Sequence, residues 1–207
     1  MALLALPANT LAAGKVEPVS PGDLDVTSGK VRPLRSGLLE IDHNSVRAVQ
    51  KGRWAQNGKI RFESRGQTAE LKPFKSGIVK EQIGLKLRAM NGCNLVYVMW
   101  TLAPKEEITV RIKENPGKTE SDDCENDGYT LLNTYRVPKK KSARNGRTSR
   151  LQADFVSKGH KHHVRVYVDN VRVLQVRIPH SFVATVNGPV GLRSDNGRFR
   201  LRLWTGR

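Results

Sequence analysis

The chain has 207 residues, with 36 lysine and arginine residues against 19 aspartate and glutamate residues, so the net charge is 36 − 19 = +17. This surplus indicates an anionic partner such as an acidic polysaccharide, a nucleic acid or an anionic membrane surface. The length and a hydrophobic content of 38% suit one globular domain and exclude wholesale disorder, and no stretch approaches the roughly 20 apolar residues of a membrane-spanning helix.

The first 37 residues differ from the rest of the chain. Residues 1–14 (MALLALPANTLAAG) resemble the end of a secretory signal peptide with a cleavage site near Ala12 or Ala13, although the usual basic start is missing. An apolar tail is therefore the alternative for this segment. Residues 15–37 are rich in proline, glycine, serine and charge, which predicts an extended arm or linker. Residues 38–207 are expected to form a single domain.

Alternation of apolar and polar residues predicts short strands through this domain, and no segment shows a helical stripe. The run LVYVMW at 95–100 is typical of a central strand covered on both sides, with Trp100 in the core. A turn at Asp169-Asn170 and another at Asn196-Gly197 each predict a hairpin. About ten strands separated by turn signals predict an all-β antiparallel β-sandwich or jelly roll. The expected strands include residues 37–41, 59–64, 68–72, 83–87, 95–100, 108–112, 164–168, 171–178, 191–193 and 199–203.

Cys93 and Cys124 are the only cysteines, and neither belongs to a C-x-x-C metal motif. One disulfide in an oxidising compartment is the simple interpretation, and two reduced thiols in a cytosolic protein are the alternative. Together with the signal-like start, the pair predicts a secreted or periplasmic protein. The chain has no N-glycosylation sequon, which is consistent with a bacterial source.

The stretch HHVRVYVDNVRVLQVRIP, followed by NGPVGLRSDNGRFRLRLW, resembles the closing strands of the concanavalin A-like lectin/glucanase superfamily. Laminin G-like and 3-keto-disaccharide hydrolase-like domains share this pattern of an exposed hairpin, a G-x-v-G-l-r-s segment and a final strand. The resemblance covers residues 160–204. It implies a β-sandwich, but the superfamily contains lectins, hydrolases, lyases and structural modules, so the function has to come from particular residues.

Enzymatic candidates are few. A glycosidase needs two carboxylates at its centre, and the adjacent Glu106 and Glu107 would point to opposite faces of a strand, which disfavours a hydrolase. A lyase acting on uronic acids needs a cation or amide and a proton-transferring side chain. Residues 68–72 (TAELK) and 82–84 (QIG) faintly resemble lyase motifs, with glycine in place of the motif histidine. The candidate catalytic residues are Tyr97, Tyr129, Tyr135 and His162.

Two clusters could hold a metal. His160 and His162 share one face of an extended segment but lack a third ligand and lie among lysines, so a solvated basic strand is favoured. Residues 123–128 read D-x-E-x-D-G, close to a calcium loop, but the twelfth position is Thr134 rather than the glutamate of an EF-hand. A simpler calcium site is the remaining metal hypothesis, using Asp122, Asp123, Glu125 and Asp127.

The positive charge is concentrated near the end of the chain. Residues 128–207 hold 17 basic and 3 acidic residues, a net 17 − 3 = +14. Six of these cations lie in residues 139–150, which indicates a mobile loop able to follow an anionic chain. On the last strand an arginine row with a terminal tryptophan shares one face, and guanidinium groups suit carboxylate, sulfate and phosphate. The predicted ligand-binding residues are Arg198, Arg200, Arg202, Trp204, Arg165, Tyr167 and Trp54.

These observations favour a carbohydrate-binding β-sandwich that recognises an anionic polysaccharide or another cell-envelope polymer. A polysaccharide lyase or hydrolase on a jelly-roll fold is the first alternative. The second is a basic protein that binds nucleic acid through the loop 139–150.

Overall fold

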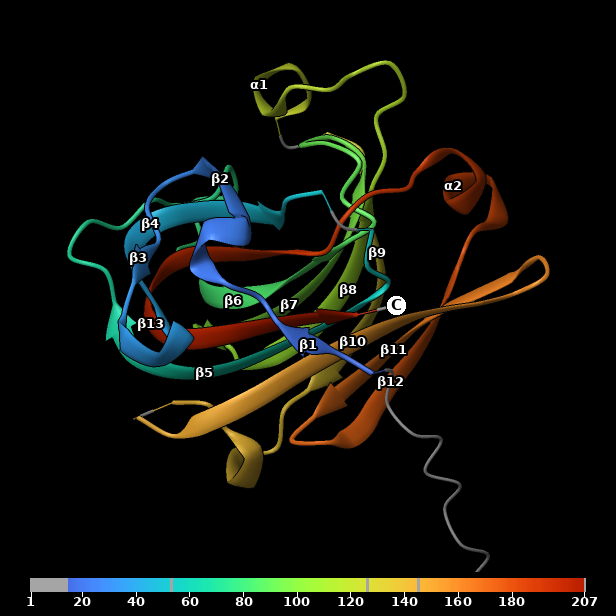
Figure 1. The fold of residues 1–207 in the computed structure, drawn as a ribbon. Coiled ribbons are helices and arrows are strands. Elements are labelled where there is room, and N and C mark those ends of the chain that lie inside the picture. The colour runs from blue at the N-terminus through green and yellow to red at the C-terminus, as the bar shows by residue number, and fades with distance from the viewer. Residues whose placement is uncertain (1–14, 53, 126, 145, 207) are drawn as a thin grey trace, which may run out of the picture.

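In the computed structural model the strands form one antiparallel network folded into two layers (Figure 1). The structure describes residues 15–52, 54–125, 127–144 and 146–206. The prediction of an all-β antiparallel sandwich is confirmed for this part of the chain. Its strands are β1 (Glu17–Pro18), β2 (Leu24–Ser28), β3 (Arg32–Pro33), β4 (Leu39–Gln50), β5 (Asn57–Gln67), β6 (Glu81–Leu87), β7 (Leu95–Ala103), β8 (Glu107–Lys113), β9 (Tyr129–Arg136), β10 (Thr148–Lys158), β11 (Lys161–Val168), β12 (Val171–Ile178) and β13 (Gly191–Gly206). Its helices are α1 (Ser121–Cys124), α2 (His180–Thr185) and the short turns η1 (Pro21–Asp23), η2 (Arg35–Gly37) and η3 (Lys139–Lys141).

The long strand β13 joins the two layers. One of its edges pairs with β4, while the other pairs with β6 over residues 191–195 and with β5 over residues 197–206. One layer continues from β6 through β7 and β8 to β9, and the other continues from β5 through β10 and β11 to β12. Side chains at the start and at the end of β13 therefore belong to different sheets.

The hairpin predicted at Asn196-Gly197 is wrong. This dipeptide bends a continuous strand at the point where β13 exchanges β6 for β5. Asn196 has the positive φ of 54° that a turn would need, but its buried side chain bonds the loop that connects β5 to β6. Its amide donates to the carbonyls of Lys72 and Lys80 and accepts from the Lys72 backbone. The hairpin predicted at Asp169-Asn170 is confirmed between β11 and β12.

The main core lies between the two layers. Trp100 of β7 is fully buried, as predicted, and packs edge-to-face on Phe62 of β5 at 5.4 Å between ring centroids. Phe62 in turn contacts Phe199 of β13 at 6.0 Å. Such pairs stabilise the core beyond the area that they bury.

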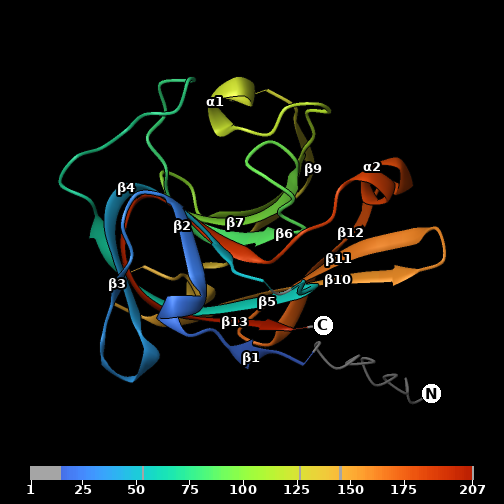
Figure 2. The same cartoon turned by 45° about the horizontal axis from the view of Figure 1, so that its top comes forward.

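Strand β7 has a second buried face. Val96, Val98, Trp100 and Leu102 enter the main core, whereas the alternate residues Tyr97 and Met99 form a small separate cluster with Ala89 and Leu95. Alternation along a strand thus directs two apolar faces in opposite directions. The side of the β6–β9 sheet that carries Tyr97 is called the open face below. In Figure 2 the loop between β5 and β6 and helix α1 stand on the same side of β6 and β7.

The disulfide between Cys93 and Cys124 is confirmed, with both half-cystines buried. It connects the loop after β6 to α1, which lies in the connection between β8 and β9. Lys113 strengthens the same junction, because its ammonium group donates to the carbonyls of Gly92 and Glu125 at 3.3 and 2.8 Å. The disulfide therefore fixes the loop after β6 to α1 at the rim of the open face.

Replacing Cys93 and Cys124 together by alanine should lower the free energy of unfolding by about 4 kcal/mol, because the unfolded chain regains the freedom of a loop spanning 31 residues. Urea unfolding at neutral pH measures this loss. Reduced wild-type protein should unfold at the same midpoint as the variant, and a loss below about 1 kcal/mol would contradict the expected role of the bridge.

Residues 15–37 lie along the domain. Strand β1 pairs with the end of β13, and strands β2 and β3 pair with β4, while Val19 and Leu24 are buried. The segment thus combines the extended backbone of an arm with contacts that a free linker would lack. The predicted signal-like segment 1–14 lies outside the described residues.

Candidate functional site

A pocket of about 220 Å³ opens on the open face, over β6, β7, β8 and β13. The loop between β5 and β6 forms one wall and Tyr129 of β9 another. Among the described residues, its lining includes four cations and three aromatic rings, and no carboxylate. The cations are Lys75, Lys80, Arg111 and Arg193, and the rings are Phe74, Tyr97 and Tyr129. A basic cavity with aromatic walls suits a ligand that has both anionic groups and apolar ring faces.

Arg193 of the pocket floor pairs with Asp195, a buried carboxylate that lines the adjoining hollow rather than the pocket itself. They are two residues apart on β13, so both side chains emerge on the open face, and Arg193 Nε donates to Asp195 Oδ2 at 2.8 Å. Arg47 of β4 donates to the other carboxylate oxygen at 2.7 Å, and the amide of Gln82 donates to Oδ2 at 2.7 Å. Three donors therefore surround one buried carboxylate.

The electrostatics of this ion pair follow from burial and pairing. Burial alone would raise the pKa of Asp195, but the charges of Arg193 and Arg47 outweigh it and hold the pKa at about 2. Burial would likewise lower the pKa of Arg193, yet Asp195 raises it well above its ordinary value. Two guanidinium groups share one carboxylate, which leaves a net positive charge at the floor.

Tyr97 and Tyr129 stack beside this ion pair, with ring centroids 5.9 Å apart. The Arg193 guanidinium lies 4.9 Å from the centre of the Tyr97 ring and donates to the Tyr129 hydroxyl at 3.1 Å. Burial raises the pKa of Tyr97. Burial also acts to raise the pKa of Tyr129, but the charges of Arg193 and Lys113 outweigh it, so that this pKa is lowered. The pKa values of the two stacked tyrosines are therefore shifted in opposite directions.

Lys86 is a second buried cation on the same face. It lies on β6, opposite Tyr97 of β7 and Gly191 of β13, and is only 4% exposed. Burial, together with repulsion from Arg47 and Arg193, lowers the pKa of Lys86 to about 7. Its charge therefore changes near neutral pH.

The structure brings together two of the four candidate catalytic residues. Tyr97 and Tyr129 meet in the pocket, whereas Tyr135 packs against the main core, because an irregularity between Val110 and Arg111 shifts the register of β9. His162 lies on β11 in the other layer. There it contacts Ser157 at 2.8 Å and His180 of α2 at 2.9 Å.

The predicted ligand-binding residues lie away from this pocket. The arginine row faces outward from the β5–β13 region, and each member contacts a neighbour: Arg198 donates to the Arg65 carbonyl, Arg200 pairs with Glu40, and Arg202 donates to the Ser36 carbonyl. The Lys59 ammonium group lies over the Trp204 ring, 4.7 Å from its centroid. Arg165 and Tyr167 lie on β11, and Trp54 is 63% exposed in the connection between β4 and β5. Their role in binding remains a prediction.

The metal hypotheses gain no geometric support. Among the described residues, no three histidine, cysteine or acidic side chains are grouped so that they could hold a metal ion. Asp122 and Asp123 are exposed in the first turn of α1, and the Asp123 carbonyl accepts from Lys118 at 2.9 Å. His160 and His162 contact different ring nitrogens of His180, at 3.1 and 2.9 Å, so they cannot converge with it on one ion in this arrangement.

Sequence reasoning missed Arg193, Arg47, Lys86 and Arg111. One signal for Arg193 was present, because arginine and aspartate two residues apart within a strand share a face and can pair. The others belong to different strands, and only the register of the sheet brings them together. Gln82, which belongs to the segment 82–84 that faintly resembles a lyase motif, does lie in the pocket.

Comparison with known proteins identifies the fold. No protein-family model and no curated protein sequence matches the chain. The structure is similar to a carbohydrate-binding module from Bacillus subtilis, with a TM-score of 0.56 and 10% identity over 86% of this chain and 91% of that one. It is also similar to an endo-1,3-beta-glucanase from Streptomyces sioyaensis, with a TM-score of 0.54 and 11% identity over 98% of both chains.

A third similar structure is a legume lectin-like domain from Entamoeba histolytica, with a TM-score of 0.52 and 13% identity over 98% of this chain and 100% of that one. At such low identities the likeness shows the fold alone. The concanavalin A-like lectin/glucanase fold predicted from residues 160–204 is therefore confirmed across nearly the whole chain.

Proposed function

We propose that this chain, which has the fold of the concanavalin A-like lectins and glucanases, binds an acidic polysaccharide in the pocket on its open face. The observation that carries the proposal is the pocket lining, whose described residues combine four cations with three aromatic rings and include no carboxylate. Guanidinium groups can bind the carboxylate of a uronic acid in a bidentate way, and aromatic rings can pack on the apolar faces of a sugar.

Two further features support the choice of an anionic ligand. Arg47 and Arg193 already share Asp195, so the floor remains positive when its internal pair is formed. Burial and repulsion from Arg111 lower the pKa of Lys80, and the charge of a bound anion would offset the repulsion. The adjoining hollow of about 220 Å³ adds Lys72 and Arg47 to the same basic surface, beside Glu125 and Asp195.

The proposed setting is an oxidising compartment, outside the cell or in the periplasm. The Cys93–Cys124 disulfide supports this, because such bonds are rare in reducing cytosol. No described helix is long and apolar enough to cross a membrane. A bacterial source remains a prediction from the sequence.

Titration calorimetry with oligomers of a polyuronate tests the proposal. Lys80→Met and Arg111→Met, each at the pocket, should weaken binding by about tenfold or more, because each removes a charge-assisted contact worth roughly 1.5–3 kcal/mol. Lys59→Met and Arg61→Met are matched controls on β5, outside the pocket, and should keep the wild-type affinity. Equal affinity in all five proteins, or no saturable binding to any polyuronate, would refute the proposal.

One observation favours a lyase as the second candidate. The lowered pKa of Tyr129 beside Arg193 and Lys113 suits a side chain that removes a proton next to a neutralised carboxylate. However, Gly84 occupies the position of the motif histidine, and a β-carbon there would collide with the Val98 carbonyl and Met99. Incubation with the same polyuronates would produce the ultraviolet absorbance of an unsaturated uronate if the chain were a lyase. Binding without that product would support polysaccharide binding and not lyase activity.

A further inference from the structure

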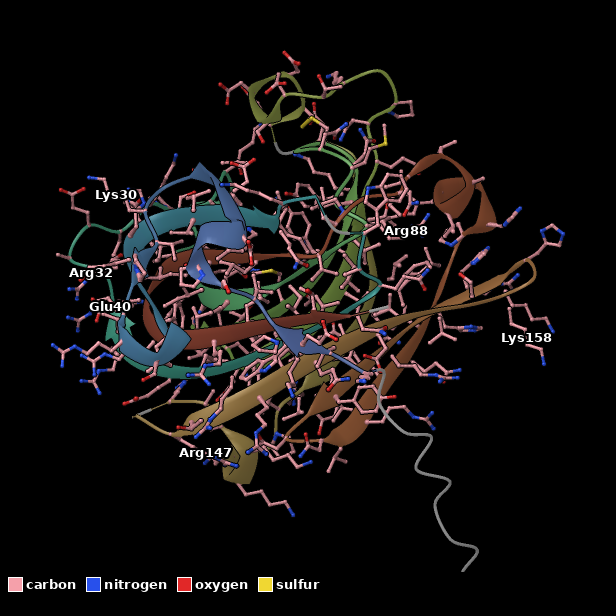
Figure 3. All side chains as sticks on the ribbon, viewed as in Figure 1. Lys30, Arg32, Glu40, Arg88, Arg147 and Lys158 are labelled. Carbon is pink, nitrogen blue, oxygen red and sulfur yellow. A yellow bond between two sulfur atoms is a disulfide. The ribbon has the colours of Figure 1, made fainter. Side chains whose placement is uncertain are left out.

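A second basic concavity lies at the loop that connects β9 to β10. This cleft of about 850 Å³ shares no lining residue with the pocket of the open face. Figure 3 shows Arg147, one of its residues, at the lower end of the molecule, whereas α1 and the rim of the open face lie at the upper end. The lining carries five cations and one carboxylate, a net 5 − 1 = +4, from Lys105, Arg136, Lys139, Arg144, Arg147 and Glu106.

The loop is held in place rather than free, in contrast to the mobile loop predicted from its charge. Glu106 of the turn between β7 and β8 accepts hydrogen bonds from Ser142 Oγ at 2.6 Å and from the Ala143 backbone N–H at 2.8 Å. The same carboxylate accepts from Trp100 Nε1 at 3.1 Å. Ala143 is fully buried and Val137 nearly so. Glu106 is the only carboxylate among the described residues that line the cleft, and both of its oxygens therefore already accept hydrogen bonds from the protein.

Backbone contacts also fix two of the guanidinium groups. Arg144 donates through Nε to the Leu102 carbonyl at 2.8 Å and through Nη2 to the same oxygen. Arg147 donates to the Lys140 carbonyl at 2.5 Å and pairs with Asp169 at 3.0 Å. Within the described part of the chain, Arg136 and Lys139 form no ion pair. The cleft thus combines two oriented arginines with two cations that no carboxylate neutralises.

We infer that this cleft is an anion site for a ligand with clustered tetrahedral oxyanions, that is, linked phosphate or sulfate groups. A single carboxylate offers two oxygens in one plane and one negative charge. Linked tetrahedral groups offer oxygens in several directions and more than two charges, which matches cations that come from the turn between β7 and β8, from the end of β9 and from the loop between β9 and β10. The inference uses none of the residues of the open face, so it stands or falls separately from the polysaccharide proposal.

Titration calorimetry with inorganic tripolyphosphate tests the site, with pyrophosphate and inorganic sulfate as shorter probes. Wild-type protein should bind one tripolyphosphate in the cleft, more tightly than it binds sulfate. The double variant Arg136→Gln, Lys139→Gln should lose affinity by about tenfold or more. Both residues are exposed, so the fold should survive, and unchanged thermal unfolding checks this.

A matched double variant, Lys158→Gln with Lys161→Gln, removes two exposed cations at the tip of the β10–β11 hairpin, far from Arg147 in Figure 3. It should bind tripolyphosphate like the wild type. Equal weakening in both double variants would mean general charge attraction and would overturn the inference. An absence of saturable binding in the wild type would overturn it as well. A polysulfated disaccharide in place of tripolyphosphate distinguishes a sulfated sugar from a phosphate ligand.

Discussion

Replacing Asp195 by asparagine should lower the free energy of unfolding by about 3–5 kcal/mol, the usual loss when one partner of a buried ion pair is removed. Asp195 is 4% exposed and is the shared acceptor for Arg193, Arg47 and Gln82. Without its charge, Arg193 would stay buried against Tyr97 with no counter-ion. Urea unfolding at pH 7 measures the loss, and Asp42→Asn, an exposed carboxylate on β4, is the matched control.

The acid limb of the stability curve checks the same pair independently. The folded pKa of Asp195 is about 2, against an ordinary value of 3.8. Its contribution is therefore complete above pH 4 and is lost as the pH falls from about 4 to 2, by about 2 kcal/mol. This part of the acid destabilisation should be missing in Asp195→Asn. A variant as stable as Asp42→Asn would show that Arg193 finds another acceptor and that the pair does not hold the floor of the pocket.

The double replacement Arg193→Met with Asp195→Leu separates the cost of an unpaired charge from the value of the pair. An apolar pair of similar volume often restores much of the stability that a single replacement removes. The double variant should therefore unfold at a higher urea concentration than Asp195→Asn. It should nevertheless bind polyuronate poorly, because the guanidinium over Tyr97 is gone.

The fold was accessible from sequence because its signals are local. Period-two alternation directs Phe199, Leu201 and Leu203 inward whatever their partners are, and the closing segment at 160–204 resembles known sandwiches. The Asn196-Gly197 prediction failed for a non-local reason. A positive φ at Asn196 serves equally for a tight turn and for a bend, and the choice depends on Lys72 and Lys80, more than a hundred residues earlier.

The site was largely inaccessible because its cations come from separate strands. Charge counting drew attention to the arginine row at the end of the chain, where Arg200 and Arg202 are already engaged by Glu40 and Ser36. The pocket instead takes Arg193 from β13 and Arg111 from β8. Tyr97 was a candidate catalytic residue, but it lies within the apolar run 95–100, which is typical of a core strand. Only the double burial of β7 shows that its alternate side chains line a second face.

The two basic concavities differ in the groups that the nearby carboxylate binds. On the open face Asp195 neutralises part of Arg193 and Arg47, and aromatic rings complete the wall. At the loop between β9 and β10, Glu106 accepts hydrogen bonds from Ser142, Trp100 and the Ala143 backbone, and the described lining residues include no aromatic ring. The first arrangement suits a sugar that carries carboxylates, and the second suits a compact polyanion.

The free energy of unfolding should rise with pH just above neutrality because of Lys86. Its folded pKa is about 7, below its ordinary value of 10.5, because it is buried near Arg47, Arg193 and Lys113. Between these two values the unfolded chain binds one proton more than the folded chain, so stability rises by up to about 1.4 kcal/mol per pH unit. From pH 7 to pH 9 this group alone should contribute about 2 kcal/mol.

Lys86→Met isolates this contribution, because methionine fills a similar volume without a charge. The variant should be more stable than the wild type at pH 7, and the difference between the two should shrink by about 2 kcal/mol by pH 9. Lys161→Met, at an exposed position on β11, should follow the wild-type curve. A constant difference between Lys86→Met and the wild type would show that Lys86 keeps its proton in the folded protein.

The protonation of Lys86 also links stability to binding. An anion bound in the pocket favours the charged form of Lys86, which lies on the same face. The affinity for polyuronate should therefore fall from pH 6 to pH 8 in the wild type and change less in Lys86→Met.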